Sequence, residues 1–213
     1  MVENRSVVMP KNNYLNAGEW EKRAKRPGLL SVMSIRWSED ECRKATESLK
    51  NEIFSFLPKL AGKRILEIGC GIGRITLDLA KRSAQLYAID ISPAMLSRAQ
   101  RVIKSNNVTF FSKCAHNTGF SDNYFDVVLE VTVLQHIVNE SLFRKTLAEI
   151  KRVIKPDGFI FLCGEVSNIH NKVSPITIIR TLSEYKKAMK PFKLMKVKNF
   201  LCVTDNYLLT LWK

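Results

Sequence analysis

The sequence predicts an α/β fold in which helices cover one mostly parallel sheet. From Lys63 onward, short runs rich in β-branched and aromatic residues alternate with stretches of helical periodicity, which is the pattern of βαβ units. The 213 residues suffice for one well-buried domain and are too few for two with separate cores. We therefore expect a domain at residues 61–213 and a helical extension at residues 1–60, which is either a lid over a pocket or an ordinary packed helix and loop.

Seven segments have the composition of strands, because each is a short apolar run bounded by turn-forming residues. They are residues 64–68, 85–90, 108–112, 125–131, 159–163, 192–203 and 207–212. The tetrad Lys155-Pro156-Asp157-Gly158 predicts a turn just before the fifth strand.

Four stretches between these strands have helical periodicity: residues 73–82, 93–105, 141–154 and 176–189. Pro93 suits the first turn of its helix, where its missing N–H costs nothing, and Ser92 can cap that helix. Residues 39–56 predict a further amphipathic helix, which Pro58 ends. Its apolar positions are Cys42, Ala45, Leu49, Ile53 and Phe56.

Composition excludes several classes of protein. A content of 46% hydrophobic and 25% charged residues is typical of a folded globular domain. No apolar run reaches the roughly 20 residues of a membrane-spanning helix, and residues 1–30 lack the compact apolar segment of a secretory signal. The five cysteines form no C-x-x-C pair, so we expect neither a disulfide framework nor a metal site. These observations predict a cytoplasmic protein.

The formal net charge of +14 is unevenly distributed, with eight Lys or Arg against two acidic residues in 176–213. The lysines of this segment are Lys186, Lys187, Lys190, Lys193, Lys196, Lys198 and Lys213. A helix would place the first three on one face and a strand would add Lys196 and Lys198 at alternate positions, giving one positive strip. Such a strip attracts nucleic acid, anionic membrane or an acidic partner, or is an ordinary solvated face.

The string Glu67-Ile-Gly69-Cys-Gly71-Ile-Gly73-Arg74 follows the first predicted strand and leads into a helix. Its glycines therefore lie at the carboxyl edge of the sheet, where open α/β sheets bind ligands. Glycine allows a ligand to approach the backbone, and a helix start supplies free N–H groups. These features suit a nucleoside ligand that carries a carboxylate.

Asp90 ends the next predicted strand, 21 residues after Gly69. A carboxylate at that place can accept hydrogen bonds from both hydroxyls of a ribose. The alternative is that Asp90 caps the following helix. Because Ser92 already offers that cap, the ribose interpretation is favoured.

These strings together resemble the class I S-adenosylmethionine-dependent methyltransferases. The family's first motif, E/D-x-G-x-G-x-G, is matched by Glu67, Gly69, Gly71 and Gly73, and its second by the string that begins at Asp90. Residues 125–136 resemble its fourth-strand motif and 147–162 its next helix and strand, so the resemblance covers roughly residues 60–165. It implies a Rossmann-like, seven-stranded, mostly parallel sheet with an antiparallel C-terminal strand and helices on both faces.

The resemblance also implies the cofactor S-adenosyl-L-methionine, with S-adenosyl-L-homocysteine as product. It places Glu67 near the amino end of the cofactor, Asp90 on the ribose and Ile91 against the adenine. Arg74 either faces the methionine carboxylate, as in the Gly-Ile-Gly-Arg variant of protein N-terminal methyltransferases, or is an exposed helix residue. The implied cofactor-binding residues are Glu67, Gly69, Gly71, Gly73, Arg74, Asp90, Ile91, Cys114, Ala115 and Glu130.

One corner departs from the family's pattern. Where the family often has an acidic residue facing the adenine amino group, this chain has Lys113-Cys114-Ala115-His116. A thiol is a poor acceptor, so we expect contact with the adenine there through the backbone at Ala115.

Methyl transfer to a hydroxyl or ammonium group is helped by a general base within hydrogen-bonding reach. The candidates are Glu130, His136, His170 and Tyr14. His136 follows the fourth strand, where the family commonly carries a histidine facing the pocket, and we take His136 and Glu130 as the catalytic candidates. Each has a structural alternative, burial or capping for Glu130 and a structural histidine for His136, while His170 lies in a loop where a solvated role is favoured.

We therefore expect a methyltransferase with a small-molecule acceptor. The chain has neither the Asn/Asp-Pro-Pro-aromatic tetrad used on exocyclic amino groups nor the Pro-Cys or Thr-Cys nucleophile of pyrimidine carbon-5 enzymes. Two alternatives remain open at this point: action on RNA or protein through the basic surface, and a non-catalytic binding module that retains the fold.

Overall fold

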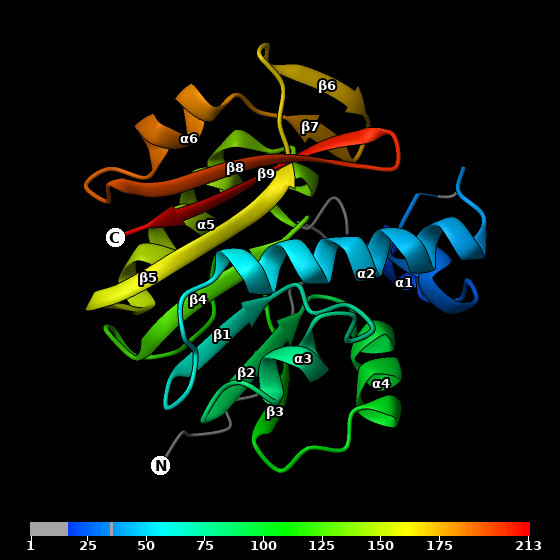
Figure 1. Cartoon of the computed structure of the whole chain (residues 1–213), viewed down its shortest axis with the longest axis horizontal. Coiled ribbons are helices and arrows are strands. Elements are labelled where there is room, and N and C mark those ends of the chain that lie inside the picture. The colour runs from blue at the N-terminus through cyan, green and yellow to red at the C-terminus, as the bar shows by residue number, and fades with distance from the viewer. Residues whose placement is uncertain (1–16, 35) are drawn as a thin grey trace.

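A computed structural model describes residues 17–34 and 36–213. Its centre is a seven-stranded sheet in the order β3-β2-β1-β4-β5-β9-β8 (Figure 1). The strands are β1 (Arg64–Ile68), β2 (Gln85–Asp90), β3 (Val108–Ser112), β4 (Phe125–Val131), β5 (Ile154–Glu165), β8 (Leu194–Cys202) and β9 (Asp205–Trp212). β1 to β5 are parallel, whereas β9 is antiparallel to β5 and to β8. The predicted Rossmann-like sheet with an antiparallel C-terminal strand is confirmed.

The expected turn before the fifth strand is instead an irregularity inside β5. Ile154 already pairs with Phe125, and pairing resumes at Phe159 with Val127, so residues 155–158 lie in a register shift. Gly158 fits this place because a Cβ there would come within 2.9 Å of the backbone oxygen of Asp126. β5 therefore begins earlier than predicted.

Helices cover both faces of the sheet, as predicted. They are α1 (Ala17–Arg23), α2 (Glu39–Phe56), α3 (Thr76–Ala80), α4 (Pro93–Val102), α5 (Glu140–Val153) and α6 (Leu182–Ala188), with short 3-10 helices η1 (Gly28–Ser31) and η2 (Leu134–His136). One core cluster joins α2 and α3 to the sheet, and a second joins α5 and α6 to the opposite face. Burial of these apolar side chains supplies most of the driving force for folding.

The predicted amphipathic helix has the expected bounds and the expected buried face. Ser38 accepts a hydrogen bond from the Glu41 N–H, and the Glu41 carboxylate accepts one from the Ser38 N–H, which forms a capping box. All five predicted apolar positions of α2 are buried. α2 therefore lies across the sheet as a packed helix (Figure 1).

The expected helix at residues 176–189 is only partly correct. Residues 171–179 form a hairpin of β6 (Asn171–Ser174) and β7 (Thr177–Ile179), and α6 begins only at Leu182. The run Ile176-Thr-Ile-Ile179 is β-branched and favours a strand. Thr181 caps α6 in a second capping box with Glu184.

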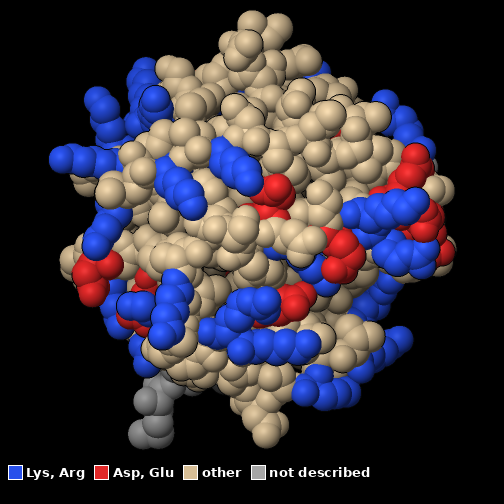
Figure 2. All heavy atoms as spheres, viewed as in Figure 1, with Lys and Arg blue, Asp and Glu red and all other residues tan. Residues whose placement is uncertain are grey.

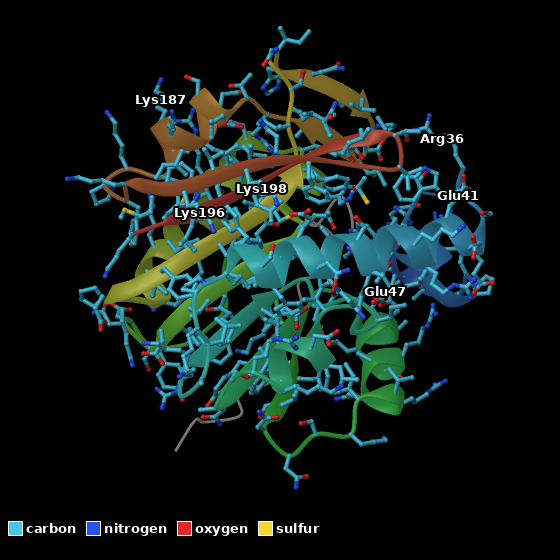
Figure 3. The ribbon with its side chains drawn as sticks, viewed as in Figure 1. Arg36, Glu41, Glu47, Lys187, Lys196 and Lys198 are labelled. Atoms are coloured by element: carbon cyan, nitrogen blue, oxygen red, sulfur yellow. The ribbon has the colours of Figure 1, made fainter. Side chains whose placement is uncertain are left out.

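The predicted positive strip is not continuous. Lys196 donates to the Phe56 carbonyl at the end of α2, at 3.1 Å, and Lys198 forms an ion pair with Glu52 at 2.5 Å. Both side chains lie beside α2, away from Lys187 on α6 (Figure 3). The strand lysines therefore fasten β8 to α2, while other basic groups remain spread over the surface (Figure 2).

All five cysteines are buried. Among the described residues, no helix is both long and apolar enough to cross a membrane.

Candidate active site

A cavity of about 170 Å³ opens at the carboxyl ends of β1, β2 and β4. Its described walls come from the glycine loop after β1, the turns after β2, β3 and β4, and helix α1. This is the edge of the sheet at which the sequence places the ligand.

The glycine loop is shaped by packing as much as by access to the cavity. The N–H groups of Gly69 and Cys70 both donate to the Ile89 carbonyl, at 2.8 and 3.0 Å. Gly69 has φ +69°, and a Cβ on it would lie 2.3 Å from Val133. Gly69 and Gly71 line the cavity, but Gly73 is not among the lining residues. A Cβ on Gly73 would lie 2.3 Å from Ile103, so Gly73 serves close packing rather than approach to a ligand.

Asp90 holds the glycine loop against the end of β2. Its carboxylate accepts hydrogen bonds from the N–H groups of Gly71, at 2.8 Å, and Ser92, at 2.9 Å. Ser92 caps α4 through the Met95 N–H, so Asp90 is not the cap of that helix. Burial raises the pKa of Asp90 despite these donors. Asp90 and Ile91 both line the cavity.

Glu67 and Arg74 bring opposite charges to the same cavity. Glu67 is buried, its Oε2 has no hydrogen-bond partner among the described residues, and burial raises its pKa to about 7. Burial also lowers the pKa of Arg74, which forms no ion pair within the described chain. A buried polar atom without a hydrogen-bond partner costs free energy, so Glu67 Oε2 is a candidate contact for a donor group of a ligand.

The segment that departs from the family's pattern, residues 113–116, lies at the cavity, as expected from the sequence. Lys113, Cys114, Ala115 and His116 line the cavity next to Ile91. The Lys113 N–H donates to the Asp90 carbonyl at 3.0 Å, which ties this corner to the end of β2.

Glu130 is buried but is not among the lining residues. Its carboxylate accepts hydrogen bonds from the N–H groups of Val133, at 2.9 Å, and Leu134, at 3.3 Å. Burial raises its pKa to about 7. The geometry gives Glu130 the capping role, in which it shapes the turn after β4.

Thr132 lines the cavity in that same turn and was missed by the sequence reasoning. It has φ +61°, an unusual conformation for a β-branched residue, and its N–H donates to Cys163 at 2.7 Å. Backbone strain of this kind concentrates at functional sites. Nothing in the local sequence signals it.

His136 lines the cavity at the end of η2. Its Nδ1 lies 3.0 Å from the Ile176 carbonyl and 3.3 Å from the Thr177 hydroxyl. Burial lowers the pKa of His136 to about 4, so the ring is neutral near pH 7. Because a carbonyl only accepts, Nδ1 carries the proton and Nε2 is the acceptor.

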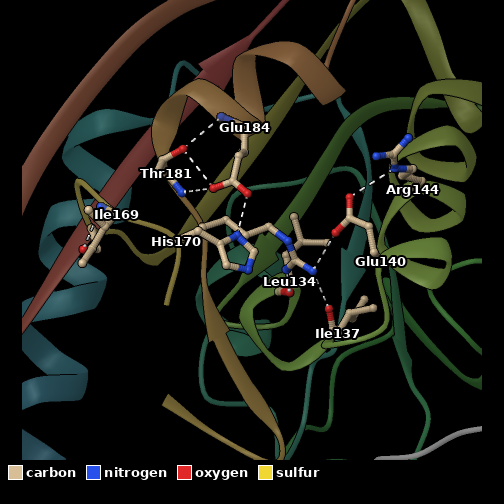
Figure 4. A network of polar contacts seen from close by, with 10 residues as sticks. Leu134, Ile137, Glu140, Arg144, Ile169, His170, Thr181 and Glu184 are labelled. Carbon is tan, nitrogen blue, oxygen red and sulfur yellow. Dashed lines mark hydrogen bonds and ion pairs between the residues drawn. The ribbon is translucent and has the colours of Figure 1, made fainter. Parts of the chain in front are cut away.

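Arg180 braces the segment that carries His136. Its buried guanidinium donates to the carbonyls of Leu134, at 3.2 Å, and Ile137, at 2.9 Å, which lie on either side of His136. It also lies 3.7 Å from the centre of the Phe143 ring. The two carbonyl residues are labelled in Figure 4.

His170 is not among the lining residues. Its Nδ1 lies 2.6 Å from Glu184, the residue that caps α6 with Thr181 (Figure 4). The structure thus separates this candidate base from the cavity. Tyr14 lies outside the described residues.

Helix α1 closes one side of the cavity with Ala17 and Trp20. The ring centres of Trp20 and His136 lie 5.1 Å apart in an edge-to-face arrangement. The Glu21 carboxylate accepts hydrogen bonds from the Ser92 hydroxyl, at 2.6 Å, and the Ala94 N–H, at 3.2 Å. Arg98 of α4 donates to carbonyls at residues 24, 26 and 28. The only sequence signal for these contacts was a tryptophan in a polar, basic segment.

Comparisons with known proteins agree with this architecture. A family model described as a methyltransferase domain matches residues 65–158. The chain is 30% identical over 149 residues to phosphoethanolamine N-methyltransferase 1 of Triticum aestivum, which covers 67% of this chain and 28% of that protein. It is 34% identical over 134 residues to a demethylmenaquinone methyltransferase of Clavibacter sepedonicus, covering 62% of this chain and 51% of that protein.

Among solved structures, a SAM-dependent methyltransferase from Leishmania major superposes with a TM-score of 0.74 at 20% identity, covering 92% of this chain and 82% of that one. The two curated relatives are longer, since the chain spans 28% and 51% of their lengths. The matched domain contains the glycine loop, Asp90 and the strands that position them. Residues 65–158 therefore form a methyltransferase domain, and the fold around them is that of S-adenosylmethionine-dependent methyltransferases.

Proposed function

We propose that this protein binds S-adenosylmethionine and transfers its methyl group to a small-molecule acceptor. The observation that carries the proposal is the buried carboxylate of Glu67, which lacks a partner for Oε2 in the described chain and lines a cavity shared with Asp90 and Arg74. In this assignment Glu67 holds the ligand's ammonium and Arg74 its carboxylate. Asp90 holds the ribose, and Ile91 lies against the adenine.

The chemistry needs little from the protein beyond alignment. When bound, S-adenosylmethionine supplies a methyl group made electrophilic by its sulfonium. The chain positions an acceptor in line with that group and excludes water. His136 accepts the acceptor's proton at Nε2, because Nδ1 faces the Ile176 carbonyl. Thr132 and the turn braced by Glu130 form the floor of the cavity.

The acceptor end of the cavity favours an apolar molecule. Its described walls include Trp20, Ile137, Val138 and Leu142, and the lining carboxylates, Glu67 and Asp90, belong to the cofactor end. A cationic acceptor would find no counter-charge among these walls. The walls and the demethylmenaquinone relative support an acceptor with an apolar or aromatic framework.

The two alternatives have weaker support. Action on RNA or protein was suggested by a continuous lysine strip, but Lys196 and Lys198 are committed to α2. A non-catalytic module would need the cofactor-binding groups but not a neutral histidine that faces the same cavity.

A calorimetric titration with S-adenosylhomocysteine tests the binding step. We expect saturable binding, weakened by about 1–3 kcal/mol in Asp90→Ala. Absence of binding at millimolar ligand refutes the proposal. Transfer of a labelled methyl group from the cofactor to extracted small molecules, rather than to RNA or protein, tests the acceptor class.

Ligand binding should depend on pH through Glu67. Its pKa of about 7 means that the unliganded carboxyl is protonated below pH 7 and must ionise to hold an ammonium group. The affinity for S-adenosylhomocysteine is then about tenfold higher at pH 8 than at pH 6. In Glu67→Gln we expect weaker binding with no such dependence. A wild-type affinity that is constant over this range contradicts the assignment.

We propose that residues 1–60 include a lid, with α1 latched onto the domain at residues 61–213. Glu21→Ala removes the acceptor for Ser92 and Ala94, at a cost of about 1 kcal/mol, so release of S-adenosylhomocysteine should be about fivefold faster. Stopped-flow fluorescence measures the release rate. Glu19→Ala is the matched control, because Glu19 lies on the same helix and shows no hydrogen bond to a described residue. Equal release rates for both variants would exclude the latch.

A further inference from the structure

The region after β5 carries half of the chain's net charge. Residues 166–203 contain eight Lys or Arg and one acidic residue, out of a total net charge of +14. Besides Lys172 on β6, four of these cations are exposed and form no ion pair within the described chain: Lys186, Lys187, Lys190 and Lys193. They lie on α6 and on the turn that leads into β8, and Lys187 is labelled in Figure 3. The catalytic proposal makes no use of them.

β8 is the edge strand of the sheet, and its two sides differ. One side carries Lys196, Lys198 and Phe200 toward α2 and the core. On the other side, Val197 and Leu201 are paired with Thr210 and Asn206 of β9 and are 47% and 65% exposed. Met195, at the register shift that begins the strand, is 60% exposed. An edge strand that turns aliphatic side chains to solvent is unusual without a partner.

The four lysines lie on the same side of the sheet as the exposed aliphatic row, which consists of Met195, Val197 and Leu201. Thr210, the partner of Val197, accepts a hydrogen bond from the Trp212 indole, so these three side chains share one face. Trp212 belongs to the core cluster that also contains Met189, with Tyr185 and Ala188 of α6 packed against it. α6 and its lysines therefore flank the face on which Val197 and Leu201 are exposed.

We propose that this surface docks the protein on an anionic phospholipid bilayer. Aliphatic side chains can enter the interfacial region while unpaired lysines bind lipid phosphates, which is the combination that peripheral membrane binding requires. The row contains no aromatic side chain on which bases would stack, so nucleic acid is a poorer fit. A second copy of this surface would add four further lysines, while Glu184, the carboxylate of α6, already pairs with His170.

Sedimentation of the full chain with vesicles tests the proposal. We expect binding to phosphatidylcholine vesicles that contain phosphatidylglycerol, at least tenfold weaker binding to pure phosphatidylcholine, and loss of binding at high salt. Equal binding to both vesicle types, or binding to neither, overturns the proposal. The assay needs no methyl acceptor, so it stands apart from the proposed activity.

Two variants separate lipid binding from its alternatives. Both Val197→Ser/Leu201→Ser and Lys186→Gln/Lys187→Gln/Lys190→Gln should reduce vesicle binding at least tenfold while leaving the affinity for S-adenosylhomocysteine unchanged. The matched controls are Val102→Ser, which is 69% exposed on α4, and Lys59→Gln/Lys81→Gln/Lys104→Gln. The proposal fails if the serine variant binds vesicles like the wild type, if only RNA competes for the lysines, or if light scattering shows a dimer that the serine variant dissociates.

Discussion

Gly69→Ala should lower the free energy of unfolding by about 2–5 kcal/mol and abolish measurable binding of S-adenosylhomocysteine. The residue has φ +69°, which strains any side chain, and the added Cβ would lie 2.3 Å from Val133 Cγ2. Relief requires Val133 to move, and Val133 lies in the turn that Glu130 holds. The substitution therefore disturbs the glycine loop and the floor of the cavity together. Urea denaturation measures the stability and calorimetry the binding.

Gly62→Ala is the matched control for this prediction. Gly62 has φ +77°, but a Cβ there meets nothing within 4 Å, so only the backbone strain of about 1 kcal/mol is expected, with ligand affinity unchanged. The double variant Gly69→Ala/Val133→Ala should recover part of the lost stability, because the clashing methyl group is removed. If Gly69→Ala and Gly62→Ala lose equal stability, the proposed contact with Val133 does not matter.

The elements that are determined by neighbouring residues were predicted correctly from the sequence. The predicted bounds of the first four strands and of α2 match those observed, because a short apolar run between turn-forming residues and an amphipathic helix with its cap are properties of adjacent residues. β7 was predicted as the start of a helix because its apolar residues also fit a helical spacing, and β6 was predicted as part of a loop. What determines that region is Arg180, which bonds carbonyls more than 40 residues away in the chain. Such partners have no signature in a local window.

The same distinction applies to the site. The glycine loop and Asp90 follow directly from their places at strand ends, and the structure brings them to one cavity. The contributions of Trp20 and Glu21 depend on α1 packing against α4, about 70 residues later in sequence, and could not be predicted from their own neighbours. Gly73 matches the family motif, yet its contact is with Ile103. A motif position therefore identifies a constrained residue without saying which contact constrains it.

His136→Gln should lower kcat by about 10²-fold while leaving the affinity for S-adenosylhomocysteine unchanged. The ring accepts a proton only at Nε2, since Nδ1 donates to the Ile176 carbonyl, and glutamine cannot take that proton. A pKa of about 4 makes His136 a weak base, so we expect an effect at the lower end of the range for general bases. Transfer of a labelled methyl group to a hydroquinone acceptor measures kcat.

The pH dependence distinguishes a base from a structural histidine. Because the pKa of folded His136 lies below its ordinary value, the ring is neutral throughout the physiological range, and its contribution to stability is lost progressively as the pH falls from about 6.5 to about 4. At saturating cofactor, wild-type kcat should therefore show no acidic limb near pH 6.5. Nitrogen chemical shifts of the histidine rings should show the Nδ1–H tautomer for His136. His170→Gln is the matched control and should retain full activity, because His170 pairs with Glu184 away from the cavity. An acidic limb at pH 6.5 that disappears in His136→Gln would show a solvated histidine and contradict this geometry.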